Sequence, residues 1–192
     1  TAWVAPLQRH RWRMDQVRAR LLMVSLSGAS GNSAAFGDKA REIAQDFAKE
    51  LYLSVPDLPW HTGRDSLCEF ANLLALIAAS AAKMAQDLIL SAQIDEGISA
   101  GPKGASSTMP HKENPTSQEA IVALSRHINS LARNMNEAMI HSQERDGAAW
   151  ALEWLALPEI TVGTAAILRM AAELASDIRV DESKLRATFF KT

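Results

Sequence analysis

The sequence predicts an all-α fold, a bundle of long helices, on the strength of three observations. Apolar residues recur at helical spacing through most of the 192 residues. Aromatic residues make up only 6% of the chain, and no long run alternates apolar and polar residues as half-buried strands do. Glycine and proline gather in a few short segments, so the stretches between them are long enough for helices that pack along their length.

Two helices are expected in the first quarter of the chain, at residues 8–26 and 40–51. The first ends ahead of the turn Gly28-Ala29-Ser30-Gly31-Asn32, whose glycines allow the backbone conformations that terminate helices. The second is amphipathic. Its apolar face consists of Ala40, Ile43, Ala44, Phe47, Ala48 and Leu51.

A third, longer helix is expected from Arg64 or Asp65 to about Gln93, because this run contains neither glycine nor proline. Its most apolar part, residues 73–92, is interrupted by charged and polar side chains. A membrane span needs about 18 or more apolar residues with few charges. The stretch is therefore expected to be buried in the protein, with no membrane as partner.

Two further helices complete the predicted bundle. Residues 121–138 carry apolar side chains at alternating three- and four-residue spacing, which is typical of a seam between packed helices. Pro158 is expected to open the last long helix. The buried face of that helix would contain Ile167, Ala171, Leu174 and Ile178.

Charge and cysteine content exclude several classes of protein. The formal charge is −2, so the arginine cluster at residues 9–20 is expected to be a solvated helix face, and no nucleic acid is expected as partner. The lone Cys68 cannot form a disulfide within the chain, which favours a cytoplasmic setting and argues against a metal site. The chain starts at Thr1 without a signal peptide, and it is expected to be a piece of a longer protein.

Residues 101–119, GPKGASSTMPHKENPTSQE, are the segment most informative about function. Ser106, Ser107 and Thr108 place three hydroxyls beside the amides of a glycine-containing turn, which suits a bound carboxylate. Lys112 and Asn114 alternate, so an extended backbone points both to one side, where they would stabilise an oxyanion. An activated serine in this setting can act as base or nucleophile.

Residues 105–115 resemble the signature of the fumarase/aspartase superfamily, G-S-S-x-M-P-x-K-x-N-P, at every fixed position except the first, which is Ala105 here. The turn at 28–32 resembles the superfamily's G-A-x-G-T, with Asn32 in place of threonine. The segments 59–65 (PWHTGRD) and 144–159 look most like those of the bacterial 3-carboxy-cis,cis-muconate cycloisomerases. The resemblance covers most of the chain.

The resemblance implies a domain organisation. Residues 1–178 would form the central helical bundle domain of the superfamily, without the N-terminal part of the family's chain. Residues 179–192 would begin a C-terminal helical segment.

The resemblance also implies roles for residues. The catalytic residues would be Ser106, Lys112, Asn114 and Glu119. Ser106 would transfer a proton alpha to a carboxylate, and Lys112 and Asn114 would hold the aci-carboxylate intermediate. Glu119 would orient a histidine acid that belongs to a preceding segment of another subunit. The residues that bind substrate would be Ser107, Thr108, Met109, His61, Arg64 and Arg145.

The implied activity is that of a cycloisomerase, an intramolecular lyase of aromatic-acid catabolism that needs neither cofactor nor metal. It would convert 3-carboxy-cis,cis-muconate or a close analogue to a carboxymuconolactone. The expected partners are a small polycarboxylate substrate and three further copies of the chain, in a cytoplasmic homotetramer whose active sites are shared between subunits.

Two alternatives stay open. One is adenylosuccinate lyase or another C–N or C–O lyase of the superfamily, and the other is a noncatalytic helical oligomeric scaffold, which Ala105 allows. Trp150 argues against adenylosuccinate lyase, because that enzyme has a phosphate-binding serine there and an indole offers one N–H and an apolar face. His141 is expected to cap a helix C-terminus rather than to act as an acid.

Overall fold

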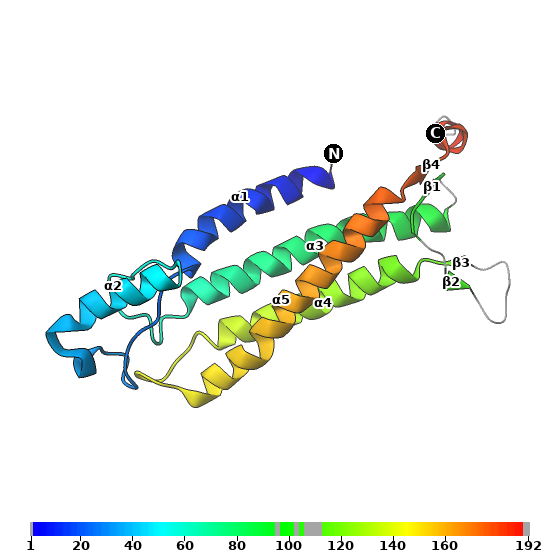
Figure 1. Ribbon diagram of the computed structural model, residues 1–192. Helices are drawn as coiled ribbons and strands as arrows, with labels where there is room; N and C mark the ends of the chain where they lie inside the picture. The colour runs from blue at the N-terminus through cyan, green and yellow to red at the C-terminus, as the bar shows by residue number, and fades with distance from the viewer. Residues whose placement is uncertain (1, 95–96, 102–103, 106–112, 190–192) are drawn as a thin grey trace. The chain divides into compact units, whose positions relative to one another are not determined.

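The computed structural model describes residues 2–94, 97–101, 104–105 and 113–189, and α-helices dominate these residues (Figure 1). The helices are α1 (Val4–Leu21), the 3-10 helix η1 (Ala34–Lys39), α2 (Ala40–Glu50), α3 (Asp65–Gln93), α4 (Thr116–Glu137), α5 (Gly147–Ser176) and α6 (Glu182–Phe189). The all-α prediction is confirmed.

Short strands that the sequence did not predict pair near the ends of these helices. The strand β1 (Ile98–Ser99) pairs antiparallel with β4 (Arg179–Val180), with Ile98 opposite Val180. The strand β2 (Gly104–Ala105) pairs antiparallel with β3 (Glu113–Asn114), with Gly104 opposite Asn114. The two sheets tie loop segments together without forming a layer of the fold.

The chain forms two compact units. The first unit comprises residues 1–7, 75–130 and 161–192, and the second comprises residues 8–74 and 131–160. Helices α1, α3, α4 and α5 each contribute one part to each unit. The boundary predicted between residues 178 and 179 falls just ahead of β4 and stays a prediction.

An aliphatic core fills the first unit. Its largest fully buried side chains are Leu88, Ile121, Ile128, Ile167 and Leu174. Helices α4 and α5 approach closely at Gly163, where a Cβ atom would lie 2.6 Å from Cδ1 of Ile128. The apolar seam predicted for α4 is therefore confirmed in this unit, whereas Ile178 lies beyond the end of α5.

Hydrogen bonds join α3 to α1 and α4 in the second unit. The Cys68 thiol donates to the carbonyl oxygen of Met135 at 3.0 Å, and the Asn72 side chain donates to Oδ1 of Asn136 at 2.8 Å. On the solvent side, Arg20 of α1 forms an exposed ion pair with Glu69. The predicted helix at 65–93 is confirmed.

The first helix ends at Leu21, so the prediction that it reaches residue 26 is wrong. The Ser54 amide donates to the carbonyl of Leu22 at 2.9 Å, and the Val24 amide donates to the carbonyl of Ser54 at 2.8 Å. This extended pairing buries Val24, which is 2% exposed. Tertiary hydrogen bonding and burial here outweigh the helical preference of Leu22, Met23 and Leu26.

The last long helix begins at Gly147, so the prediction that Pro158 opens it is also wrong. The Asp146 carboxylate caps the helix by accepting hydrogen bonds from the amides of Ala148 and Ala149, at 2.9 and 3.1 Å. Hydrogen bonding, chiefly from Ala149, holds the pKa of Asp146 below its ordinary value. Pro158 lies inside the helix, where it supplies no N–H to the backbone ladder.

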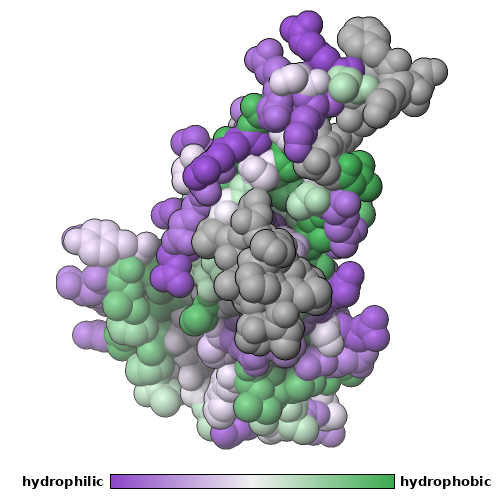
Figure 2. Space-filling model, turned by 90° about the vertical axis from the view of Figure 1, so that its right-hand side faces the viewer, coloured by the Kyte–Doolittle hydropathy of each residue, from purple (hydrophilic) through white to green (hydrophobic). Residues whose placement is uncertain are grey.

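Helices α3 and α5 are long and apolar enough to cross a membrane by length and composition alone. In α3, 56% of the most apolar window is buried within the chain, which is how the core helix of a soluble protein behaves. On α5 only 28% of the corresponding window is buried. Apolar side chains of α5 consequently reach the surface, among them Leu155 and Val162. Figure 2 shows one face of the molecule, on which hydrophobic and hydrophilic residues are interspersed.

Cys68 is predicted to resist alkylation in the folded protein. Its side chain is 3% exposed, and burial, reinforced by the Glu153 carboxylate, raises the pKa of the thiol to about 11. Because only the thiolate reacts, its population at pH 8 should be ~100-fold below that of an ordinary cysteine. Treatment with iodoacetamide followed by mass spectrometry should find Cys68 unmodified until guanidinium unfolds the protein. Rapid labelling of the folded protein would contradict the packing of α3 on α4.

Candidate active site

A buried ion pair anchors the candidate site in the second unit. Arg64 immediately precedes α3, and its Nε and Nη2 atoms donate to Oε2 and Oε1 of Glu153 on α5, at 2.8 and 2.6 Å. The two side chains are only 11% and 7% exposed. Removing both charges from water is costly, and a bidentate geometry of this kind is what offsets that cost.

The ion pair leaves one edge of the Arg64 guanidinium for other partners. Nε and Nη2 are engaged by Glu153, whereas Nη1 has no hydrogen-bond partner among the described residues. The guanidinium carbon lies 4.9 Å from the centre of the Trp60 ring, in a cation–π contact. Arg64 is therefore held rigidly, with N–H donors left to offer a ligand.

An aromatic cluster centred on Trp150 stands beside the ion pair. The His61 ring meets the Trp150 ring edge-on with centroids 5.0 Å apart, and the His141 ring does so at 6.2 Å. Trp154, one turn further along α5, stacks on Trp150 at 6.2 Å. The Arg145 guanidinium carbon lies 5.0 Å from the centre of the Trp150 ring. Two imidazoles and a cation thus surround one indole.

The two histidines bring buried nitrogen atoms without partners. Nε2 of His61 and both ring nitrogens of His141 are buried and make no hydrogen bond to a described residue. A buried polar group left unpaired costs about 1–3 kcal/mol, so these atoms are suited to a ligand or a bound water. The prediction that His141 caps a helix is wrong, because α4 ends at Glu137 and His141 bonds to none of its carbonyls.

The predicted turn at 28–32 positions His61. Gly31 has φ = +73°, a left-handed conformation, and a Cβ atom there would lie 2.9 Å from Cβ of His61. Only glycine combines this conformation with so close an approach. The adjoining depression has a volume of about 280 Å³. It is lined by Ser25, Ser27, His61, Arg64, Trp150, Glu153 and Trp154.

The structure describes some of the predicted site residues, and these fall into two groups, one in each unit. His61, Arg64 and Arg145 come together around Trp150 and Trp60 in the second unit. Asn114, in β3, and Glu119, exposed in the first turn of α4, belong to the first unit. The remaining predicted site residues lie outside the described residues. They are Ser106, Ser107, Thr108, Met109 and Lys112.

Sequence reasoning missed the role of Glu153. It is the one charged residue between Gly147 and Pro158, and a lone acid in an apolar helix signals a buried, paired carboxylate. Its partner lies 89 residues away, so the sequence did not identify the pair. Among the described residues, no three His, Cys, Asp or Glu side chains gather as metal ligands do.

Known proteins are similar to this chain in sequence. A family model described as lyase matches residues 1–129. The 3-carboxy-cis,cis-muconate cycloisomerase of Pseudomonas aeruginosa is 40% identical over 184 residues, covering 94% of this chain and 40% of that protein. The N-acetyl-S-(2-succino)cysteine lyase of Dickeya dadantii is 33% identical over 190 residues, covering 96% of this chain and 42% of that protein.

Solved structures match along nearly the whole chain. The 3-carboxy-cis,cis-muconate lactonizing enzyme of Pseudomonas putida superposes with a TM-score of 0.89 at 35% identity, covering 97% of this chain and 42% of that one. The fumarate lyase of Mesorhizobium sp. BNC1 superposes with a TM-score of 0.86 at 32% identity, covering 96% and 41%. The chain thus spans about two fifths of the length of the relatives that it matches.

The ion pair between Arg64 and Glu153 is predicted to be far more important for stability than the exposed pair between Arg20 and Glu69. Glu153→Gln should lower the free energy of unfolding by about 3–5 kcal/mol, because it leaves a buried cation uncompensated. Glu69→Gln removes the same group from a pair whose side chains are 52% and 41% exposed, and it should cost a small fraction of that. Urea unfolding followed by circular dichroism measures both, and equal losses would contradict the burial of the Arg64 pair.

Proposed function

Because the chain belongs to the lyase family, we propose that the protein containing it is a 3-carboxy-cis,cis-muconate cycloisomerase. The observation that carries the proposal is the agreement between sequence and structure comparisons. Relatives with this activity in their names match 94–99% of the chain at 34–40% identity, and the lactonizing enzyme has the same helical arrangement. The substrate would be 3-carboxy-cis,cis-muconate or a close analogue, and the product a carboxymuconolactone.

The reaction needs one new C–O bond and one proton. A carboxylate oxygen of the substrate adds to a carbon of the conjugated diene, and the displaced π electrons collect on the neighbouring carboxylate as an aci-carboxylate. Protonation of the carbon alpha to that carboxylate completes the lactone. The charge that develops in this step is what an active site must stabilise, and no cofactor is needed to balance it.

Residues of the segment 105–119 would supply this chemistry. Ser106 would deliver the proton to the alpha carbon, and Lys112 and Asn114 would hold the aci-carboxylate. Glu119 would orient a histidine acid. Further contacts to the substrate would come from Ser107, Thr108 and Met109.

Residues around Trp150 would bind substrate carboxylates. His61 offers a buried nitrogen without a described partner, and Arg64 offers the Nη1 edge that Glu153 does not use. Arg145 adds a cation at the Trp150 ring. Because Trp150 has no hydroxyl with which to hold a phosphate, the cluster favours a polycarboxylate over adenylosuccinate.

A second candidate is a lyase that releases fumarate from a succinyl adduct. The observation in its favour is the relative from Dickeya dadantii, named N-acetyl-S-(2-succino)cysteine lyase, at 33% identity. Both candidate reactions make or break a bond beta to a carboxylate and pass through a carboxylate-stabilised carbanion. They therefore need the same electrostatic stabilisation and are separated by assay.

An apolar stripe on α5 supports self-association, and the family resemblance implies four copies. Five exposed residues recur at four- and three-residue spacing along this helix: Ala151, Leu155, Pro158, Val162 and Ala165. Leu155 and Val162 are 73% and 70% exposed. Such spacing is the seam by which helices pack on one another, so we propose that copies of the chain cover it. A cytoplasmic location suits the unpaired Cys68 thiol.

The activity is tested on the whole protein with three compounds. We expect it to consume 3-carboxy-cis,cis-muconate, seen as loss of the diene's ultraviolet absorbance, in preference to adenylosuccinate and N-acetyl-S-(2-succino)cysteine. Ser106→Ala should lower turnover about 10²- to 10⁴-fold, the usual contribution of general acid–base catalysis. The control Ser176→Ala, at the end of α5, should retain full activity. A folded protein that turns over none of the three would contradict the proposal and favour the noncatalytic scaffold.

The assembly is tested by sedimentation velocity. We expect the whole protein to sediment as a tetramer and the double variant Leu155→Glu, Val162→Glu to form smaller species, because buried carboxylates disfavour the interface. Leu58→Glu, in the loop before α3 and 78% exposed, adds the same kind of charge away from α5 and should stay tetrameric. Circular dichroism checks that the variants keep their helices. A tetrameric double variant would show that another surface holds the copies together.

A further inference from the structure

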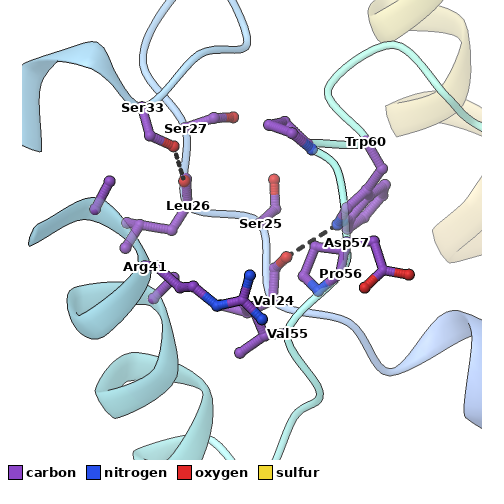
Figure 3. A pocket seen from close by; sticks show the side chains of 13 residues that line it. Val24, Ser25, Leu26, Ser27, Ser33, Arg41, Val55, Pro56, Asp57 and Trp60 are labelled. Carbon is purple, nitrogen blue, oxygen red and sulfur yellow. Dashed lines mark hydrogen bonds between the residues drawn. The ribbon is translucent and has the colours of Figure 1, made fainter. Parts of the chain in front are cut away.

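A second cavity, of about 220 Å³, lies in the second unit beside α2. Figure 3 shows it between this helix and the segments that carry Val24–Ser27 and Val55–Trp60. Its volume is below the range of about 300–1,000 Å³ typical of drug-sized ligands, so it suits a small metabolite. Ser25 and Ser27 line both this cavity and the depression at His61, whereas the remaining residues that line the cavity do not line that depression.

The cavity is preformed by hydrogen bonds in its walls. The Trp60 indole Nε1 donates to the carbonyl of Val24 at 3.0 Å, as Figure 3 shows. The Val24 amide in turn donates to the carbonyl of Ser54 at 2.8 Å. These bonds fix the two segments relative to each other before any ligand arrives, which reduces the entropy lost on binding.

One cation, Arg41, lines this cavity without a partner among the described residues. The Arg41 side chain extends from α2 so that its guanidinium lies next to Val24 and Ser25 (Figure 3). Within the described part of the chain, it makes no ion pair or hydrogen bond. The hydroxyls of Ser25 and Ser27 also make no hydrogen bond to any described residue, but in Figure 3 they point away from the guanidinium. The guanidinium fork by itself matches the geometry and charge of a carboxylate.

The other lining residues restrict the remainder of the ligand. Val24, Leu26, Val55 and Trp60 present carbon surface, which favours an apolar skeleton. The Asp57 carboxylate lines the same cavity and is exposed, so it repels a second negative charge. We propose that this cavity is a binding site for a small monocarboxylate with an apolar body, separate from the polycarboxylate site. The proposal does not depend on the activity of the protein.

The probe is 4-methylpentanoate, titrated calorimetrically into the whole protein. We expect saturable binding at one site per chain. Arg41→Gln should weaken it tenfold or more, the effect of losing a charge-assisted hydrogen bond. Ala44→Met, which fills the cavity from α2, should weaken it as strongly. The matched control Lys49→Gln removes a cation from the same helix away from the cavity and should leave the affinity within twofold.

Two analogues and one further variant define the ligand class and the place of binding. 4-Methylpentanamide lacks the charge and succinate carries a second one, and each should displace the bound probe at least tenfold more weakly than 4-methylpentanoate does. Trp150→Leu alters the other depression and should leave the affinity within twofold. The proposal is overturned if the probe does not bind, if the amide or succinate displaces the probe equally well, or if Trp150→Leu rather than Arg41→Gln abolishes binding. The analogue series needs only the unmodified protein, so it decides the matter even where a variant fails to fold.

Discussion

Charged groups that are removed from water must be paired, and Arg64 and Glu153 meet this requirement across 89 residues of sequence. Their two hydrogen bonds fix the start of α3 against the second turn of α5. That register brings His61, three residues before Arg64, to the face of Trp150, three residues before Glu153. The same carboxylate contributes to the raised pKa of Cys68. The geometry of the candidate site therefore depends on one ion pair.

The composition of α5 places a second constraint on the molecule. A mostly apolar helix needs neighbours on more than one side, yet the stripe of α5 at Leu155 and Val162 is exposed in the single chain. The opposite face packs against other parts of the chain, where Ile160 and Ile167 are fully buried. One face of the helix thus stabilises the fold of the chain, and the other is available for assembly. Folding and oligomerisation would depend on the same element.

Helices with uninterrupted periodicity were predictable, because their signal is local. The α3 helix was predicted from a run of residues without glycine or proline, and the α4 helix was predicted from its apolar seam. The end of α1 at Leu21 was not predictable, since residues 22–24 are held by hydrogen bonds to Ser54 rather than by any stop signal of their own. In the candidate site, His61, Arg64 and Arg145 were predicted from motifs. Glu153 was missed because pairing between distant residues leaves no local pattern.

The ion pair also decides which groups in the depression remain for a polyanionic ligand. With Arg64 neutralised by Glu153, its net charge contribution is small, and the cation left at the cluster is Arg145 on Trp150. His61 and His141 add buried nitrogens with no described partner, and each imidazole carries at least one N–H donor. The proposed site would recognise carboxylates largely through directed donors rather than through accumulated positive charge. Directed donors discriminate by position, so the rigid placement of His61 by Gly31 and of Arg64 by Glu153 would be a source of selectivity among carboxylates.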